Sequence, residues 1–279
     1  MKVRDIAFDG HRISIEFGVA EIDALIDFLF LDLDHRAGAD VDAVFRIELM
    51  AEQSQWRLTR NKTQLFLGDS LNDLGSVLAG EALFSLIENN RYRMAIHAGL
   101  VSNTQGCVLL PADSGSGKSS VTTWLLTQGW HYHTDELVLI DLENGKLQAF
   151  TRPLNIKPAG LEAISEIIDL KKITHDLRAG SITTMIPHRL INPQFNRQIP
   201  QLNLIVFPHY SADTKPSMSK LSGAQAGLEL MRSNVIARNL SGHGFNHVVN
   251  LVRNIPAYRL RYQHFDDLES LFERIGARS

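Results

Sequence analysis

The sequence predicts an α/β fold, in which a mixed sheet flanked by helices is preceded by an α+β region. Three observations favour this fold. An apolar run, a loop of small residues and a helical pattern follow one another in residues 106–128. A second apolar run begins at once, in residues 130–142. Strand, loop, helix and strand in that order are typical of an α/β core, whereas residues 1–90 carry strand and helix patterns without such a unit.

The N-terminal region is predicted to begin with a hairpin. Asp9-Gly10 lies between two runs of strand-forming residues, and an Asp-Gly pair in that position is a turn signal. The other predicted elements are helices in 20–33 and 71–90, and strands in 44–50 and 55–69. No recognisable catalytic arrangement lies here. Partner recognition is therefore the role left to residues 1–90, and catalysis is assigned to residues 91–279.

From residue 91 onward, the patterns predict strands and helices in succession. Strands are expected in 94–102, 106–112, 130–142, 146–150, 201–210 and 257–263. Helices are expected in 117–128, 160–173, 224–240, 245–255 and 264–276. Residues 174–198 and 210–223 are predicted to be irregular, the first of them mobile. Residues 195–201 and the amphipathic segment 264–276 are candidates for contact with a partner or a second subunit.

Composition limits the classes of function. The chain has 279 residues and a net charge of -3, so no basic excess points to nucleic acid. No apolar run approaches the length of a bilayer span, and the first residues lack the apolar core of a signal peptide. Cys107 is the single cysteine and lies in an apolar run, so a buried thiol is expected. These observations predict a cytoplasmic protein with no nucleic-acid or membrane partner.

The segment Asp113–Ser119 reads D-S-G-S-G-K-S and matches a phosphate-binding loop. The pattern is G-x-x-x-x-G-K-[ST], and Ala112 takes its first glycine position. In such a loop, backbone N–H groups at a helix N-terminus converge on phosphate oxygens. A glycine-rich turn without a ligand is the alternative, but the strand before and the helix after favour ATP with Mg²⁺. The predicted nucleotide ligands are Ser114, Gly115, Ser116, Gly117, Lys118, Ser119 and Ser120.

Two further patterns suggest other functions. Leu221–Gln225, LSGAQ, resembles the signature peptide of ABC transporter ATPases, but no apolar strand ending in Asp-Glu follows it. It is better explained as a loop and a helix start capped by Ser222. His131, His133 and Asp135 alternate along a predicted strand, as metal ligands can. No third histidine is near them in sequence, so a zinc site is not expected.

The interval between the loop and the next acidic pair resembles that of the HPr kinase/phosphorylase family. One helix and a turn at Gln128-Gly129 lead from Ser119 to Asp135-Glu136. That family has a loop similar to G-D-S-G-x-G-K-S, an acidic pair on the next strand, and a histidine after isoleucine before the loop, here Ile96-His97. The likeness is best over residues 91–159.

The chain is more similar to the shorter HPr-kinase-related proteins of bacteria, which are linked to peptide-modification systems with small carrier proteins. The shared segments are S-G-S-G-K-S, Trp130–Glu136, Arg152-Pro153 and Pro256–Leu260. The chain departs from the bifunctional enzymes at Glu136, where they have Asp, and at Ser120, where they have Glu. Both departures weigh against phosphorylase activity. The N-terminal region does not resemble theirs, which weighs against HPr itself as the substrate.

The resemblance and the short spacing together imply a phosphate-loop kinase. Asp135 is the candidate general base, because a serine hydroxyl attacks phosphorus only when a nearby group accepts its proton. Catalytic roles are expected for Asp135, His97 and Lys118, and Mg²⁺ is expected to bind Ser119, Asp135 and Glu136. Arg152 and Lys157 are expected to contact phosphate. Solvated charges at a strand edge are the alternative for the acidic pair. Asp141, next to a turn signal, is read as a turn residue.

The implied activity is transfer of the γ-phosphate of ATP to a hydroxyl, on a Ser or Thr of a peptide or small protein. A small-molecule alcohol is an alternative acceptor. A P-loop ATPase or a nucleotide-dependent binding protein without a phosphoacceptor is the rival class. The family's enzymes are often oligomers, so a homo-oligomer is a further expectation of the resemblance.

Overall fold

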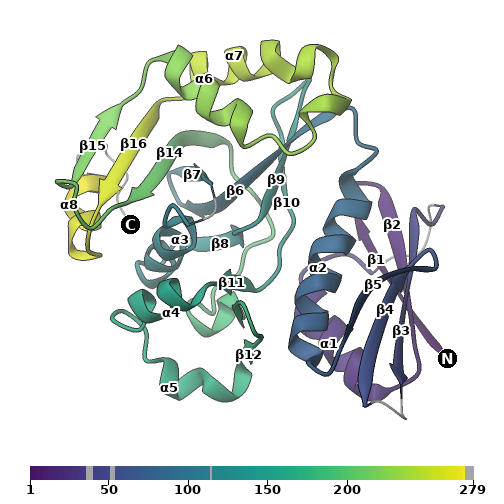
Figure 1. The fold of residues 1–279 in the computed structure, drawn as a ribbon. Helices are drawn as coiled ribbons and strands as arrows, with labels where there is room; N and C mark the ends of the chain where they lie inside the picture. Colours follow the sequence, from purple (N-terminus) through teal and green to yellow (C-terminus); the bar gives the residue numbers. More distant parts are fainter. Residues whose placement is uncertain (36–39, 51–53, 114, 274–279) are drawn as a thin grey trace.

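The computed structural model describes the chain except for residues 36–39, 51–53, 114 and 274–279. Residues 2–87 form a five-stranded sheet and two helices (Figure 1). In spatial order the strands are β1 (Lys2–Phe8), β2 (His11–Phe17), β3 (Ala43–Met50), β4 (Gln55–Arg60) and β5 (Thr63–Gly68). The helices are α1 (Ala20–Phe30) and α2 (Leu71–Ile87). Strands β2 and β3 run parallel and the other neighbours antiparallel, so the predicted α+β character is present.

The β1–β2 hairpin predicted from Asp9-Gly10 is confirmed. Asp9 and Gly10 have φ values of 52° and 82°, and a two-residue turn with positive φ at both positions suits the right-handed twist of its strands. The Asp9 carboxylate accepts a bond from Asn90 Nδ2 at 2.7 Å and lies 2.8 Å from Arg93 Nε. The hairpin tip is therefore tied to the start of the second sheet.

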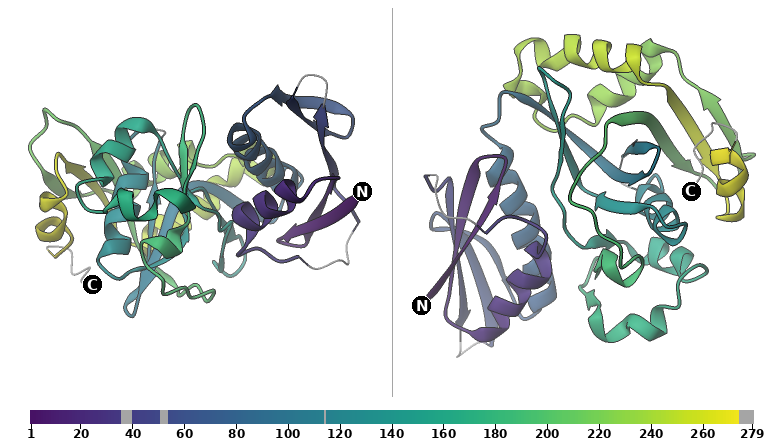
Figure 2. Two further views of the ribbon diagram at one scale, coloured as in Figure 1. Left: turned by 90° about the horizontal axis from the view of Figure 1, so that it is seen from below. Right: turned by 180° about the vertical axis from the view of Figure 1, so that it is seen from behind.

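The two parts of the chain share one hydrophobic core. Figures 1 and 2 show α1 and α2 between the five-stranded sheet and the rest of the molecule. Ile22 and Leu25 of α1 belong to the same buried cluster as Leu137 and Phe150 of the second part. The rings of Phe8 and Phe150 meet edge to face, with centroids 5.4 Å apart. Full burial of each such side chain stabilises the fold by about 1.5–3 kcal/mol.

Residues 93–262 contain an eight-stranded mixed sheet. In spatial order its strands are β10 (Leu147–Ala149), β9 (Leu137–Asp141), β6 (Arg93–Asn103), β7 (Gly106–Pro111), β14 (Leu202–Tyr210), β16 (Ala257–Tyr262) and β15 (Ser217–Lys220). The eighth strand, β8 (His131–Thr134), pairs with the far end of β6. Strands β7, β14 and β16 run parallel, and their neighbours are antiparallel. The mixed α/β character predicted from the sequence is confirmed.

Helices cover both faces of this sheet. They are α3 (Lys118–Thr127) and α8 (Asp266–Glu273) on one face, and α6 (Gly223–Arg232) and α7 (Phe245–Asn254) on the other. Successive residues of β7 show the alternation, since Val108 and Leu110 pack with the first pair and Cys107 and Leu109 with the second. Cys107 is fully buried, as expected, and burial raises the pKa of its thiol to about 12.

The single strand predicted over 130–142 is wrong, because the chain forms β8 and β9 with a bend at Asp135-Glu136 between them. Thr134 explains the interruption. Its Oγ1 accepts the Glu136 N–H at 3.0 Å and the Leu137 N–H at 3.4 Å, and donates to the Phe150 carbonyl at 2.7 Å. A threonine hydroxyl that satisfies nearby backbone groups competes with the strand ladder.

Other boundaries also differ from the predictions. The helix predicted over 160–173 is two short helices, α4 (Pro158–Ile164) and α5 (Leu170–Ile173), and the helix predicted over 224–240 ends at Arg232. The predicted irregular stretches contain strands, which are β12 (Arg178–Ala179), β13 (Thr184–Ile186) and β15. With β11 (Leu154–Ile156), β12 and β13 form a small antiparallel sheet. The 3₁₀ turns are Thr174–Asp176, His188–Leu190, Ala237–Asn239 and Ser241–Gly244.

Within the described part of the chain, no helix combines the length and the apolar character that crossing a membrane requires.

Candidate active site

The predicted phosphate loop joins the end of β7 to the start of α3. Gly115 and Gly117 both have φ of 88°, a left-handed conformation that glycine adopts without a steric penalty. Gly117 is the residue immediately before α3. A Cβ atom at this position would collide with the hydroxyl of Tyr262. The second glycine of the motif is therefore required both by its backbone angle and by the close approach of a side chain.

Two tyrosines from the far strands of the sheet hold the loop. The Tyr262 hydroxyl donates to the Gly117 carbonyl at 3.0 Å, and the Tyr210 backbone N–H donates to the Ser116 carbonyl at 2.9 Å. Their rings lie edge to face with centroids 5.7 Å apart. These two bonds use carbonyl groups of the loop and none of its N–H groups, of which Ser116 N–H donates to the Asp113 carbonyl at 3.2 Å. The sequence analysis missed both tyrosines.

The first two residues of α3 converge on the acidic pair. Lys118 Nζ donates to the backbone carbonyl of Asp135 and lies 3.1 Å from its Oδ1. The Ser119 hydroxyl donates to Asp135 Oδ2 at 2.5 Å. Asp135 and Lys118 are buried, with 5% and 7% of their surfaces exposed. The structure thus brings together three residues that the sequence assigned to the site from two separate segments.

Glu136, the second acid of the pair, contacts a different cation from the one that Asp135 contacts. Its carboxylate forms an ion pair with Arg152, and Tyr132 fixes the Arg152 backbone by donating to its carbonyl at 2.9 Å. Burial alone would raise the pKa of Glu136, but the positive charges of Arg152 and Lys118 help to outweigh it and lower the pKa below its usual range. Glu136 is therefore ionised at neutral pH, as a metal ligand must be.

His97 lies on β6 and lines the same cavity as Lys118 and Glu136. Burial lowers the pKa of His97, and the charge of Lys118 lowers it further, while Glu136 and Asp135 oppose the shift only in part. Its imidazole is accordingly neutral at pH 7, with one nitrogen able to accept a proton or a hydrogen bond.

These residues surround a cavity of about 620 Å³. The predicted site residues that line it are His97, Gly115, Gly117, Lys118, Ser119, Ser120, Asp135, Glu136, Arg152 and Lys157. The sequence analysis did not assign a role to several other lining residues, among them Asp113, Asn155, Glu162, Glu166, Thr183 and Tyr210. Asn155 Oδ1 is buried without a hydrogen-bond partner among the described residues, so it is free to accept a donor from a ligand. No local pattern marks Asn155 or Thr183, since they approach the loop only through the small β11–β13 sheet.

Some predicted residues do not lie in this cavity. Ser116 lines a smaller hollow of about 330 Å³ on another side of the loop, and its Oγ donates to the Asp113 carbonyl at 2.7 Å. Ser114 lies outside the described residues. Asp141 accepts the N–H groups of Glu143 and Asn144 at 2.9 and 3.1 Å, so it is the turn residue that the sequence predicts.

The donor set fits a magnesium nucleotide. Ser119, Asp135 and Glu136 offer hydroxyl and carboxylate oxygens, the hard ligands that Mg²⁺ prefers, and Mg²⁺ commonly uses one or two carboxylates together with substrate phosphates. The loop adds unpaired backbone N–H groups at the N-terminus of the ten-residue helix α3. The oxygen ligands and the loop residues line the same cavity, so Mg²⁺ and a phosphate chain can be held together.

The two patterns set aside in the sequence have structural roles. Ser222 caps α6 and forms a capping box with Gln225, as its position predicts. His133 is 2% exposed, and its Nε2 lies 2.8 Å from the Ser102 hydroxyl. His131 Nδ1 lies 3.5 Å from the Gln194 carbonyl instead. Burial lowers the pKa of His133 from 6.5 to about 4.

His133 is expected to make stability depend on pH. Its folded pKa is depressed, so the unfolded chain takes up the proton first as the pH falls. The contribution is fully present above pH 6.5 and is lost between pH 6.5 and about 4, by about 3 kcal/mol in total. Urea denaturation of His133→Asn should show a flatter pH profile than wild type, whereas His264→Asn, at an exposed position, should keep the wild-type slope. Equal slopes in all three proteins would contradict this assignment.

Comparison with solved structures shows a distant likeness. No family model matches the chain. No curated protein matches it either. Among solved structures, the Hpr(Ser) kinase/phosphatase from Coxiella burnetii is similar, with 12% identity, a TM-score of 0.35, and coverage of 65% of this chain and 95% of that chain. The site described above does not depend on this likeness.

Proposed function

We propose that the chain is an ATP-dependent kinase that transfers the γ-phosphate to a hydroxyl, on a Ser or Thr of a peptide or small protein. The observation that carries the proposal is the convergence of Lys118 and Ser119 on Asp135. It joins a phosphate-type loop at a helix N-terminus to a buried carboxylate. A glycine-rich turn without a ligand would not need a lysine and a serine aimed at a buried acid.

The loop residues bind and orient the triphosphate. Loop N–H groups at the start of α3 would bind phosphate oxygens, and Lys118, which lies 3.1 Å from Asp135, would neutralise the β- and γ-phosphates. Ser119, Asp135 and Glu136 would hold Mg²⁺, which would offset the negative charge of the phosphate oxygens. Arg152 is well placed for the same task, because its backbone is fixed by Tyr132 and its side chain by Glu136. Phosphoryl transfer depends mainly on such positioning and charge.

Proton transfer completes the reaction. The acceptor hydroxyl oxygen bonds to the γ-phosphorus as the bond from phosphorus to the β-phosphate oxygen breaks, and ADP leaves. We assign the hydroxyl proton to Asp135. The neutral imidazole of His97 orients the acceptor or the phosphate within the same cavity.

The test is phosphate transfer itself. The full chain is incubated with γ-labelled ATP, Mg²⁺ and serine- and threonine-containing peptides translated from reading frames beside its gene. A labelled peptide that Lys118→Ala fails to label supports the kinase, and mass spectrometry should place the phosphate on a hydroxyl. Release of inorganic phosphate without a labelled peptide would support the ATPase alternative. Label on an alcohol metabolite alone would replace the peptide acceptor by a small molecule.

A further inference from the structure

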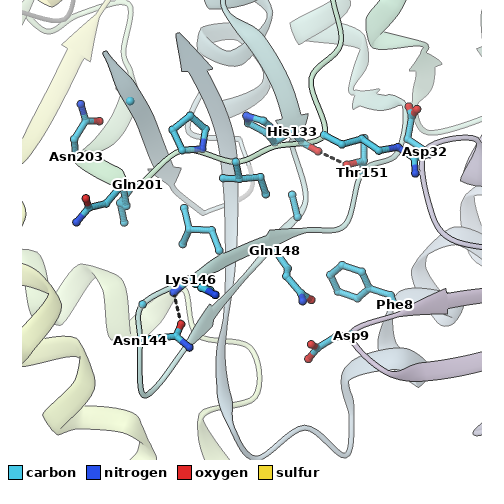
Figure 3. A pocket seen from close by; sticks show the side chains of 18 of the residues that line it. Phe8, Asp9, Asp32, His133, Asn144, Lys146, Gln148, Thr151, Gln201 and Asn203 are labelled. Atoms are coloured by element: carbon cyan, nitrogen blue, oxygen red, sulfur yellow. Dashed lines mark hydrogen bonds between the residues drawn. The ribbon is translucent and has the colours of Figure 1, made fainter. Parts of the chain in front are cut away.

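A second cavity, of about 1170 Å³, lies between the N-terminal region and the edge of the eight-stranded sheet (Figure 3). It has no lining residue in common with the active-site cavity, but the two are neighbours: Thr151 lines this cavity and Arg152 lines the other. We call it the β10 groove, since all three residues of β10, Leu147–Ala149, line it. Residues 195–201, which the sequence marked for partner contact, supply five more lining residues, namely Phe195, Arg197, Ile199, Pro200 and Gln201.

Strand β10 has an open edge. It is the last strand of its sheet and pairs with β9 alone. The Phe150 N–H donates to the Leu137 carbonyl at 3.0 Å, and the Asp141 N–H donates to the Lys146 carbonyl at 2.9 Å. The backbone N–H and C=O groups of the even-numbered residues therefore point toward β9. Alternation in an antiparallel ladder therefore directs the N–H and C=O groups of Leu147 and Ala149 away from the sheet. Such groups are a template for another extended strand.

The wall opposite β10 comes from the N-terminal region. Figure 3 shows Phe8 and Asp9 on one side of the groove, with Asp32 farther along it and Gln148 lying between them and β10. Gln148 Oε1 is buried without a hydrogen-bond partner among the described residues. A buried acceptor without a partner is unfavourable, and a donor from an occupant would satisfy it.

The charges of the groove favour an acidic occupant. Asp9 is already paired with Arg93, and Asp32 with His188 and Arg189. 

The cations of the groove are less engaged. Arg197 is 3.9 Å from Asp34 and largely exposed. Lys146, just before β10, forms none of the ion pairs within 4.0 Å found among the described residues, although its charge helps to lower the pKa of Asp141. Asp9 and Asp32 are neutralised at closer range than the cations of the groove, and the third acid, Asp34, lies 3.9 Å from Arg197. Lys146 is therefore the cation that an acidic side chain of the occupant would meet.

We propose that the β10 groove binds an extended, acidic segment of the phosphoacceptor protein, which adds to β10 as a further strand. This rests on the proposed function, because it assigns the occupant to the kinase substrate. Strand addition draws affinity from main-chain hydrogen bonds and selectivity from alternate side chains. A segment bound along β10 keeps the acceptor protein beside the active site, since Thr151 and Arg152 are consecutive residues.

The experiment measures peptide binding to the full chain in the absence of nucleotide. A displayed library of random peptides is selected on the immobilised protein, and enriched peptides are synthesised with a fluorescent label. We expect acidic peptides that lose about tenfold in affinity for Ala149→Pro, which removes one outward N–H without breaking the β9 ladder. The matched control is Lys220→Pro on β15, the opposite edge, whose N–H also points outward because the Leu221 N–H faces β16. This variant should bind the peptides as wild type does.

Hydrogen exchange on the wild-type chain gives a second readout that needs no variant to fold. Bound peptide should slow exchange at the Leu147 and Ala149 amides and leave β15 unchanged. Selection that yields no binder, binding that Ala149→Pro leaves unaltered, or protection elsewhere would overturn the groove assignment. The proposed function can fail separately. If peptides bind at β10 but no hydroxyl is ever phosphorylated, the kinase function and the identification of the occupant as its substrate are refuted, while strand addition to β10 stands.

Discussion

Lys118→Ala is expected to abolish phosphate transfer and to remove the rise in melting temperature that Mg²⁺-ATP produces in the wild-type chain. A ligand that binds only the folded state stabilises it by mass action, so loss of affinity shows directly as loss of that rise. The variant should also be less stable without nucleotide, by about 3–5 kcal/mol, because Asp135 keeps a buried charge whose partner has gone.

Each variant is therefore compared with its own nucleotide-free melting curve. Lys220→Ala is the matched control, since it removes an exposed lysine far from the loop, on β15, and should leave both the nucleotide-induced rise and transfer unchanged. If Lys118→Ala retained the wild-type rise and turnover, the phosphate loop would be wrongly assigned.

Asp135→Asn is expected to retain ATP binding and to lose phosphate transfer. Asparagine is nearly isosteric and its amide oxygen can still accept a bond from Lys118 or from Ser119, but it cannot take the hydroxyl proton. Removal of a general base costs about 10²–10⁴-fold in rate, and a weaker Mg²⁺ site would add to this loss. Single-turnover transfer measures the chemical step, and nucleotide-induced stabilisation measures binding in the same protein.

Asp141→Asn is the control for this experiment. Asp141 ends β9 and accepts two backbone N–H groups of the following turn, which asparagine can also do. Its rate should stay within a few-fold of wild type. An inactive Asp141 variant beside an active Asp135 variant would reverse the assignment and favour a hydrolytic site at the end of β9.

Local patterns predicted the parts of the fold that short segments determine. The Asp9-Gly10 turn, the strand before the loop and the helix after Gly117 all follow from residue types within a few positions of one another. The proximity of Lys118 and Asp135 could also be predicted from the sequence, because a single helix and turn separate them. The break in the predicted strand depended on the Thr134 hydroxyl reaching Phe150, a contact that no local pattern contains.

Long-range contacts explain what the sequence analysis missed in the candidate site. Tyr210 and Tyr262 reach the loop from strands that enter the sheet about 90 and 140 residues later, through parallel pairing of β7, β14 and β16. Asn155 enters the cavity on β11, whose partner strand lies in a stretch predicted to be irregular. Periodicity can mark a residue as a strand member, but it does not say which loop that strand will support.

The hydrogen bond from the Tyr262 hydroxyl to the Gly117 carbonyl has a consequence for synthesis on the ribosome. The loop leaves the exit tunnel well before the strand that supports it, because Tyr262 follows Gly117 by 145 residues in the chain. A nascent chain stopped before β16 carries the complete loop motif but lacks Tyr262, and β14 lacks its parallel neighbour on that side. If the loop binds ATP as proposed, the ability to retain it should therefore arise abruptly once β16 has emerged, so that shorter nascent chains do not sequester ATP.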